Sequence, residues 1–506
     1  MRLKELLKDI PMKNRNRDEI PDIDILGIAD NSNDVRPGYI FIAIRGYTTD
    51  GHDYILDALH KGATVIIGEE DLELEVPYIQ VDNSRIVLSR IAQFFYGFPD
   101  RKKTMIGITG TNGKTTTSYL LKHILKAAGK RCTLIGSIET IVNGVSIPSK
   151  NTTPGSLDIY RLLHQSQDDF IIMEVSSHGI AQYRVEGLSF DYCLFTNLDH
   201  EHLDFHSSME DYYQIKAQLF NQLKKDGVAV INCDNPWGER LKGELKKKGK
   251  QVITLGQGKQ ENVQILYFDL KNSSCIVTIE DNVFSIQSAL KGIHNLYNAI
   301  MAYKVAEMIG IPRNQIFLSL TDFCGIKGRF EMLESEQGAK VIIDYAHTKD
   351  AFFHILSTAR YLGAKRIIHV FGFRGNRDTT KRKDMLLTSS GLSDTYILTF
   401  DDLNGVSEEE MLRQLSDLEE TYGNGKGTVI PDRTIAIKTA LDVAKEGDWI
   451  IITGKGHEKY QKDFLLPASN DHEAVMIAQS ISYLPIKRTS RSRESELFTS
   501  DIYFNR

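Results

Sequence analysis

A short segment rich in glycine and threonine carries the clearest chemistry in this sequence. Residues 109–118, Thr-Gly-Thr-Asn-Gly-Lys-Thr-Thr-Thr-Ser, follow the apolar run 105–108 and precede a stretch with helical periodicity, 119–128. Glycines in such a turn let backbone N–H groups face an anion, and the N-terminus of the next helix adds its dipole. Lys114 can reach the β- and γ-phosphates of a nucleotide, and the Thr115 hydroxyl can hold Mg²⁺. The segment therefore predicts a site for ATP and Mg²⁺.

Acidic side chains follow two further apolar runs. Glu174 ends the run 170–174, where a buried carboxylate is costly unless it is paired or binds a metal. A carboxylate beside a P-loop usually holds Mg²⁺ on the nucleotide phosphates, although an acid at a strand end can also simply be paired. Residues 197–206 place three histidines and three acids within ten residues. That composition suits a metal but does not choose among metals.

The composition bounds the class of protein. With 506 residues the chain exceeds what one hydrophobic core usually supports, so about three domains are expected. Basic and acidic residues are interspersed and the formal net charge is −6, which argues against a nucleic-acid partner. The five cysteines form no CxxC pair, and no apolar run approaches the roughly 20 residues of a membrane span. We expect a cytoplasmic protein without membrane insertion.

Alternating apolar strands and helical segments predict an α/β fold with three domains, in which a central P-loop domain with a parallel sheet is flanked by two smaller α/β domains. The predicted limits are 1–102, 103–327 and 328–486, followed by a flexible tail at 487–506. Strands are expected at 39–44 and 63–67, then at 105–108, 170–174, 192–196 and 228–231, and last at 341–344, 367–371, 396–399 and 449–453. Helices are expected at 55–61 and 295–308, and alternating polarity between about 250 and 290 favours an antiparallel insertion.

Several of these motifs together resemble the Mur ligase family. Gly-Thr-Asn-Gly-Lys-Thr-Thr at 110–116, Glu-Val-Ser-Ser-His-Gly at 174–179 and Asn-Leu-Asp-His-x-His-Leu-Asp-x-His at 197–206 are similar to the central domain of members that add the third peptide residue to UDP-N-acetylmuramoyl-dipeptide. The resemblance implies the catalytic residues Lys114, Glu174, His202 and Lys216, and the metal ligands Thr115, Glu174, His202 and Lys216. Lys216 would act as a carbamate, because N-carboxylation converts an ammonium that repels Mg²⁺ into a carboxylate that binds it.

The resemblance continues into the C-terminal domain. His-Asn-x-x-Asn at 294–298, Gly-Arg-x-Glu at 328–331 and Asp-Tyr-Ala-His-Thr at 344–348 match family motifs, with Lys349 in place of a proline. The implied ATP site comprises Gly110, Thr111, Asn112, Gly113, Lys114, Thr115, Thr116, Asn295, Arg329, Asp344 and His347. We therefore expect the C-terminal domain to close over ATP.

Polar positions of the first two domains match the part of the family that binds the UDP-sugar peptide. The implied residues are Ser32, Asn151, Thr152, Thr153, Ser176, Gln182 and Arg184. Hydroxyls, amides and a guanidinium suit a polyanionic ligand. Of the family's Asp-Ser-Arg triplet, only the serine remains at 31–33, which leaves a nonstandard nucleotide-sugar open.

The incoming amino acid is implied by segments of the last domain. Residues 371–382 resemble Gly-Gly-Asp-Arg-Asp-x-x-Lys-Arg, and Gly-Lys-Gly-His-Glu lies at 454–458. The implied residues are Arg382, Asp401, Asp402, Asn404, Gly454 and Glu458. The Asp-Asn-Pro-Arg motif of members that add meso-diaminopimelate reads Asp-Asp-Leu-Asn at 401–404, without the arginine that would meet a second carboxylate. This favours L-lysine or another amine-bearing residue, and a nonstandard acceptor stays open.

The resemblance implies an ATP-dependent amide ligase of peptidoglycan precursor synthesis, which we expect to be monomeric. Its substrates would be UDP-N-acetylmuramoyl-L-Ala-D-Glu and a free amino acid, and the reaction would pass through an acyl phosphate. A folylpolyglutamate synthetase-like ligase uses the same ATP chemistry, but the small N-terminal domain and Arg184 argue against it. A P-loop ATPase switch is the alternative from another class, and it would hydrolyse ATP without an amino acid. An inactive homologue that only binds its ligands is disfavoured by the presence of all four catalytic residues.

Overall fold

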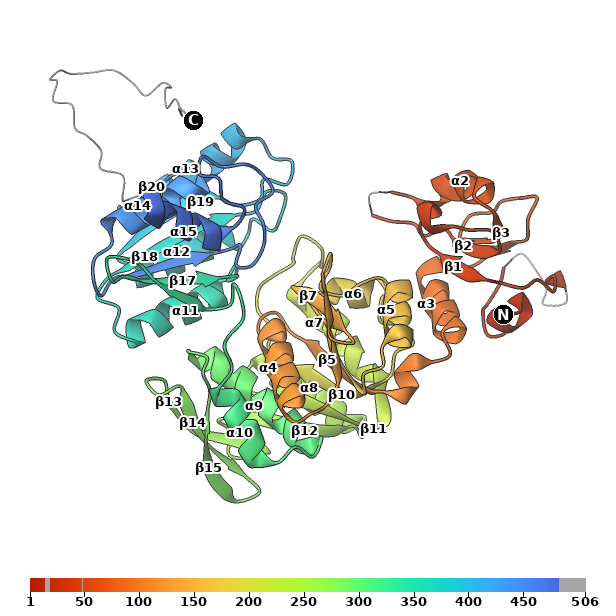
Figure 1. The fold of residues 1–506 in the computed structure, drawn as a ribbon, viewed down its shortest axis with the longest axis horizontal. Coiled ribbons are helices and arrows are strands. Elements are labelled where there is room, and N and C mark those ends of the chain that lie inside the picture. Colours follow the sequence, from red (N-terminus) through yellow and green to blue (C-terminus); the bar gives the residue numbers. More distant parts are fainter. Residues whose placement is uncertain (14–18, 48, 482–506) are drawn as a thin grey trace.

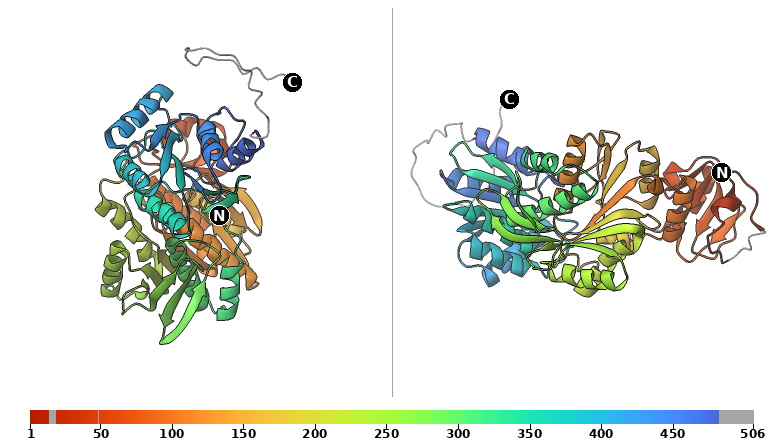
Figure 2. Two further views of the ribbon diagram at one scale, coloured as in Figure 1. Left: turned by 90° about the vertical axis from the view of Figure 1, so that its left-hand side faces the viewer. Right: turned by 90° about the horizontal axis from the view of Figure 1, so that it is seen from below.

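The computed structural model describes residues 1–13, 19–47 and 49–481 and shows three lobes in a row (Figure 1). Within these residues each lobe carries one sheet, of four, eleven and six strands. Helices cover the sheets, as two further views show (Figure 2), so the predicted α/β fold with three domains is confirmed. The predicted tail, 487–506, lies outside the described residues.

The N-terminal lobe is built on a parallel sheet whose strands follow chain order. Its elements are α1 (Leu3–Leu6), β1 (Gly27–Ala29), β2 (Tyr39–Ile42), α2 (Ile55–His60), β3 (Ala63–Gly68), β4 (Tyr78–Gln80) and α3 (Ser84–Phe95). Helix α3 begins where the Asn83 side chain accepts the N–H groups of Arg85 and Ile86, which are otherwise unpaired at a helix start. Its other end is tied to the central lobe, because the Gln93 amide donates to the Gly187 carbonyl at 2.6 Å.

The central lobe is built on the eleven-stranded sheet, in the order β15-β14-β13-β12-β11-β10-β5-β9-β6-β7-β8. Its strands are β5 (Thr104–Thr109), β6 (Cys132–Ile135), β7 (Glu139–Val142), β8 (Val145–Pro148), β9 (Phe170–Glu174), β10 (Phe190–Phe195), β11 (Leu223–Asn232), β12 (Gln251–Gly256), β13 (Val263–Asp269), β14 (Ser274–Ile279) and β15 (Asn282–Gln287). Its helices are α4 (Lys114–Ala127), α5 (Ser156–Gln165), α6 (Ser177–Ala181), α7 (Met209–Ala217), α8 (Pro236–Lys247), α9 (Ile293–Met308) and α10 (Arg313–Thr321).

Strand β5 shows why the central strands read as continuous apolar runs. Successive side chains of a strand point to opposite faces of the sheet. Met105 packs into the core beneath α5 and α7, whereas Ile106 and Ile108 pack into the core beneath α4 and α9. Both faces are covered, so residues 105–108 carry no polar side chain. The sheet is parallel from β13 to β6. The carboxyl ends of β5, β9 and β10 consequently meet at one edge.

The predicted antiparallel insertion over 250–290 is wrong for its first half. Strand β12 pairs in parallel with β11, and β13 begins in parallel with β12. Only β14 and β15 are antiparallel, and they extend the same sheet. The alternating polarity arises because one face of these edge strands is exposed, which does not by itself define strand direction.

The C-terminal lobe is built on a sheet in the order β16-β17-β21-β18-β19-β20, in which only the β16–β17 pair is antiparallel. Its elements are β16 (Glu331–Glu334), β17 (Lys340–Asp344), α11 (Lys349–Tyr361), β18 (Ile367–Phe373), α12 (Arg382–Leu392), β19 (Thr395–Phe400), α13 (Glu408–Tyr422), β20 (Gly427–Val429), α14 (Arg433–Val443), β21 (Trp449–Thr453) and α15 (Asp471–Ile481). A fully buried ion pair, Arg433 Nε to Asp471 Oδ1 at 2.7 Å, joins α14 to α15.

No helix within the described ranges has both the length and the apolar character needed to span a membrane.

Candidate functional site

The predicted phosphate loop joins β5 to α4. Gly110 and Gly113 have φ angles of +145° and +88°, which L side chains rarely adopt. A Cβ on Gly113 would lie 2.4 Å from the Asn298 Oδ1 atom, so glycine is also required by space. The loop is held from β10, since the backbone N–H of Asn112 donates to the Asn197 side chain at 2.9 Å. Helix α4 then starts at Lys114 without a side-chain cap, which leaves its first N–H groups facing a cavity suited to phosphate.

Lys114 lies inside this loop. Its Nζ atom donates to the carbonyl oxygens of Gly110 and Thr111 at 2.8 and 3.0 Å. Burial lowers the pKa of Lys114 to about 8, with Glu174 opposing the shift. A nearby anion would therefore stabilise the ammonium form of Lys114.

This pKa predicts that ATP affinity depends on pH. A triphosphate beside Lys114 favours the ammonium, so binding raises the pKa and takes up a proton when the free enzyme is deprotonated. We expect the Kd of a non-hydrolysable ATP analogue to rise by up to about tenfold per pH unit above about pH 8. Calorimetric titration between about pH 7 and pH 9.5 measures this. A flat profile would contradict the assignment, and the weaker binding of Lys114→Gln should show no such slope.

The residues predicted to hold Mg²⁺ offer a fitting donor set at the carboxyl ends of the strands. Glu174 is fully buried and accepts hydrogen bonds from the hydroxyls of Thr115 and Ser137 at 2.9 and 2.8 Å. A Cβ at Gly136 would lie 2.4 Å from the Glu174 Oε1 atom, so the chain leaves room for this carboxylate. Among the described residues Glu174 has no ion-pair partner. A buried carboxylate beside a P-loop threonine, without a cation of the chain, suits a divalent cation.

Lys216, on α7, approaches the same loop from the other side. Its side chain is about 1% exposed, its Nζ donates to the Gly110 carbonyl at 2.9 Å, and it lies 4.7 Å from the centre of the Tyr212 ring. Burial and the nearby Lys114 ammonium hold the pKa of Lys216 well below its usual range. The neutral amine is the form that can add CO₂ and become the predicted carbamate.

His202 lines two adjoining cavities, one at the phosphate loop and one in the C-terminal lobe. Its backbone is left-handed, with a φ of +59°, and its ring packs against that of His178 at 4.8 Å. Burial and the neighbouring His178 and Lys216 lower its pKa well below the usual value. The imidazole is therefore neutral, as a metal ligand must be.

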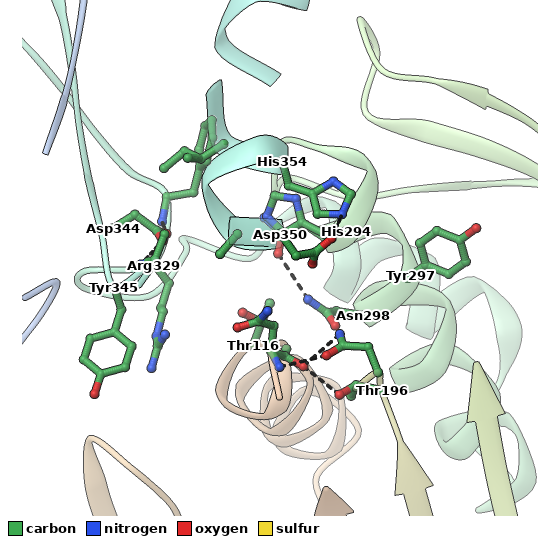
Figure 3. Close-up of a pocket in the computed structure, with 18 of the residues that line it drawn as sticks. Thr116, Thr196, His294, Tyr297, Asn298, Arg329, Asp344, Tyr345, Asp350 and His354 are labelled. Atoms are coloured by element: carbon green, nitrogen blue, oxygen red, sulfur yellow. Dashed lines mark hydrogen bonds and ion pairs between the residues drawn. The ribbon is translucent and has the colours of Figure 1, made fainter. Parts of the chain in front are cut away.

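A cavity of about 280 Å³ lies next to the phosphate loop, between α4, α9 and α11 (Figure 3). Labelled side chains from the three helices, including Thr116, Asn298 and Asp350, surround it. Predicted residues in its lining are Asn112, Gly113, Thr116, Asn295, Arg329, Asp344 and His347. His294 is half-buried, and its enclosed Nδ1 atom has no hydrogen-bond partner among the described residues. A polar cavity with an unpaired ring nitrogen, beside a phosphate loop, suits the base and ribose of a nucleotide.

The C-terminal lobe reaches this cavity through Arg329. Its guanidinium donates to Thr115 Oγ1 at 3.4 Å and lies 4.3 Å from the centre of the Tyr345 ring. Asp344 is enclosed, and its carboxylate accepts the N–H groups of Phe330 and Ala346 at 2.6 and 2.7 Å. Asp344 therefore shapes the turn that carries Arg329 into the site.

Ion pairs hold the central and C-terminal lobes together around the cavities. Lys381 Nζ lies 2.7 Å from Glu201 Oε2, and both side chains are largely buried. Arg377 pairs with Asp204 at 3.4 Å. Lys349, which replaces the family's proline, starts α11 and pairs with an acid of its own lobe. The structure is thus closed at this junction.

Most of the residues predicted for the UDP-sugar peptide form one network beside Glu174. Thr153 Oγ1 donates to the Glu174 carbonyl at 3.0 Å and contacts Ser176 Oγ at 3.1 Å. Arg184 donates to the Thr153 carbonyl and to the Gln182 side chain, both at 2.6 Å. Thr152 Oγ1 contacts Ser137 Oγ at 3.0 Å. Two residues of the predicted set lie outside this network: Asn151 is exposed, and Ser32 is buried in the N-terminal lobe, after β1.

A cavity of about 180 Å³ in the C-terminal lobe adjoins the phosphate cavity, and both are lined by Glu201, His202, Tyr345 and His347. Of the residues predicted for the amino acid, Arg382 and Asp401 line it. Arg382 donates to the Gln414 side chain and the Arg374 carbonyl at 2.8 and 3.0 Å. A Cβ on Gly454 would lie 2.8 Å from Asp401 Oδ2, so this glycine makes room for the aspartate.

The remaining predicted side chains already have partners within the chain. Asp402 accepts Lys455 Nζ at 2.7 and 2.8 Å, and Glu458 pairs with Arg374. Asp402 and Asn404 line a separate cavity of about 270 Å³. Asp402 and Glu458 thus already pair with cations of the chain.

Sequence reasoning missed three groups of site residues. Tyr297 donates a hydrogen bond to Asp234 at the nucleotide cavity. Glu201 and Lys381 form an ion pair between the central and C-terminal lobes. Arg374 lines the amino-acid cavity. Asp234 carried a signal, since it follows the carboxyl end of the apolar strand β11, where ligands bind in parallel sheets. Arg374 carried another, since it stands where the motif that ends at Lys381 and Arg382 has a glycine.

Comparisons with known proteins agree with this architecture. Residues 108–306 match the Mur ligase middle domain, residues 328–456 match the glutamate ligase domain of Mur ligases, and residues 23–96 match the catalytic domain of the Mur ligase family.

Similar proteins cover almost the whole chain. A UDP-N-acetylmuramoyl-L-alanyl-D-glutamate–2,6-diaminopimelate ligase of Caldanaerobacter subterraneus subsp. tengcongensis is 37% identical over 472 residues, which are 91% of this chain and 95% of the relative. A protein of the same name from Fusobacterium nucleatum subsp. nucleatum is 39% identical over 442 residues, 86% of this chain and 89% of the relative. A solved structure of a protein so named superimposes with a TM-score of 0.65 at 25% identity and covers 95% of this chain and 99% of its own. The chain belongs to the Mur ligase family of ATP-dependent ligases.

Proposed function

We propose that this protein adds a diamino acid to UDP-N-acetylmuramoyl-L-Ala-D-Glu, as a cytoplasmic, monomeric enzyme of peptidoglycan precursor synthesis. The proposal rests above all on the two adjoining cavities at the junction of the central and C-terminal lobes. One contains the phosphate loop and the other contains Arg382, and four residues are common to both linings. An acyl phosphate formed in the first cavity would therefore lie within reach of an amine held in the second. The names of the relatives agree with this substrate and acceptor class.

The chain's own groups supply most of the charge stabilisation. Lys114, the first N–H groups of α4 and the Arg329 guanidinium face the position of the transferred phosphoryl group. The reacting carboxylate of the dipeptide attacks the γ-phosphorus and ADP leaves, which gives the acyl phosphate. The acceptor amine then attacks the acyl carbon, and phosphate departs as the amide forms.

Thr115, Glu174, His202 and carbamylated Lys216 would hold Mg²⁺, which neutralises phosphate charge when bound. The polar network of Thr153, Ser176 and Arg184 beside Glu174 would orient the dipeptide toward the phosphate loop. The remaining positions assigned above to ATP, to the UDP-sugar peptide and to the amino acid complete this proposed site. The closed lobe junction would keep water from the acyl phosphate.

The function is tested by offering single amino acids with ATP, Mg²⁺ and UDP-N-acetylmuramoyl-L-Ala-D-Glu, and reading product mass and phosphate release. We expect a condensed product, and we expect phosphate release only when the UDP-dipeptide and an amino acid are both present. Phosphate release without an amino acid would instead indicate an ATPase switch. Absence of any condensed product would overturn the substrate assignment.

A further inference from the structure

We propose that Arg374 is a specificity-determining residue that binds a distal carboxylate of the incoming amino acid. The inference rests on the proposed function and names the acceptor class: a diamino dicarboxylic acid rather than a monocarboxylic one. Aligned on Lys381 and Arg382, the sequence has Arg374 where the resembling motif has its first glycine. A long cationic side chain thus replaces a hydrogen atom at the edge of the amino-acid cavity.

The position of Arg374 is well defined. It lies at the end of β18, immediately after Phe373, and its side chain is about 26% exposed and lines the cavity together with Arg382. Its Nη2 donates to Glu458, and its Nε lies 3.6 Å from Asp401 Oδ1. These carboxylates fix one edge of the planar guanidinium.

The other edge of the guanidinium is available. Among the described residues Arg374 Nη1 makes no hydrogen bond, whereas Nη2 donates to Glu458 and Nε lies within ion-pair distance of Asp401. The guanidinium also lies 5.6 Å from the centre of the Tyr345 ring, a residue common to both cavities. An oriented guanidinium with free N–H donors at a cavity wall is suited to a carboxylate.

The charges at this end of the cavity favour a zwitterionic group. Three acids, Asp401, Asp402 and Glu458, are met by two cations, Arg374 and Lys455. One negative charge is left over in this cluster, and Asp401, the acid of the three that lines the cavity, can receive an ammonium. An acceptor whose distal end carries both an ammonium and a carboxylate would therefore use the acids and Arg374 at once, while Arg382 remains for its α-carboxylate.

The experiment compares kcat/KM for 2,6-diaminopimelate and for L-lysine in the wild type and in Arg374→Gln. We expect the wild type to prefer diaminopimelate, and the substitution to lower this preference by about 10- to 100-fold, because one charge-assisted pair is lost. Arg360→Gln is the matched control: Arg360 pairs with Asp394 at 2.7 Å in the same lobe but does not line the cavity, so the preference should not change. A preference for lysine in the wild type, or an unchanged ratio in Arg374→Gln, would overturn the proposal.

A second measurement does not depend on folding of the variant. 2-Aminopimelate carries a distal carboxylate without the distal ammonium, so it should be condensed by the wild type or should inhibit competitively with diaminopimelate. If it does neither, Arg374 does not bind the distal carboxylate. If the wild type condenses no amino acid at all with the UDP-dipeptide, the proposed function fails, and this outcome is distinct from a changed ratio.

Discussion

Lys114→Ala is expected to lower kcat for the condensation by about 10³-fold or more. Lys114 lines the cavity at the phosphate loop, and we propose that its ammonium binds the β- and γ-phosphates. Removing a charged donor that stabilises a phosphoryl transition state in a water-excluded site typically costs about 10² to 10⁵ in rate. The effect is measured as the rate of phosphate release with the UDP-dipeptide and the amino acid both at saturating concentration.

The control for Lys114→Ala is Lys126→Ala. Lys126 lies in the last turn of the same helix and is exposed, so its removal should leave kcat within about twofold. If Lys114→Ala keeps more than about a tenth of the wild-type kcat, Lys114 does not stabilise the transferred group.

Lys216→Ala is expected to lower kcat by at least about 100-fold and to recover part of it when formate or acetate is added. Burial and the nearby Lys114 ammonium hold the pKa of Lys216 well below its usual range, which favours the neutral amine, and a neutral amine can add CO₂ to give a carbamate. Alanine removes that carboxylate and leaves space for a small one. Rates across a series of carboxylate concentrations provide the measurement.

Lys225→Ala is the matched control, because Lys225 is exposed soon after α7 and should neither lose activity nor respond to carboxylates. A fully active Lys216→Ala enzyme would show that catalysis does not need a carbamate at this position. A folded but inactive variant that no carboxylate rescues would assign Lys216 a role other than that of a metal-binding carbamate.

The parts of the site that could be predicted are those encoded in short segments. The glycines, Lys114 and Thr115 are nearly contiguous, so their local conformation follows from the loop itself. Glu174 could be placed beside them because the parallel strands β5 and β9 end at the same edge. The α/β class followed from the continuous apolar strands in the same way.

What could not be predicted depends on contacts between distant segments. The pairing of Asp402 with Lys455 joins residues 53 positions apart, so the sequence alone does not show that this aspartate already has a cation of the chain as its partner. The sequence shows that Arg374 replaces a motif glycine, but only the fold brings its side chain between Glu458 and Asp401. The direction of β12 was missed for a related reason, because residue patterns report exposure of a face and not which strand lies alongside.

The acyl phosphate intermediate is tested most directly by following oxygen from the dipeptide carboxylate to the released phosphate. UDP-N-acetylmuramoyl-L-Ala-D-Glu labelled with ¹⁸O in its free carboxylates is incubated with ATP, Mg²⁺ and the preferred amino acid, and the phosphate is analysed by mass. An acyl phosphate transfers one labelled oxygen to each phosphate as the amide forms, so we expect one ¹⁸O per phosphate released. Unlabelled phosphate would show that ATP is hydrolysed by water and would rule out an acyl phosphate intermediate.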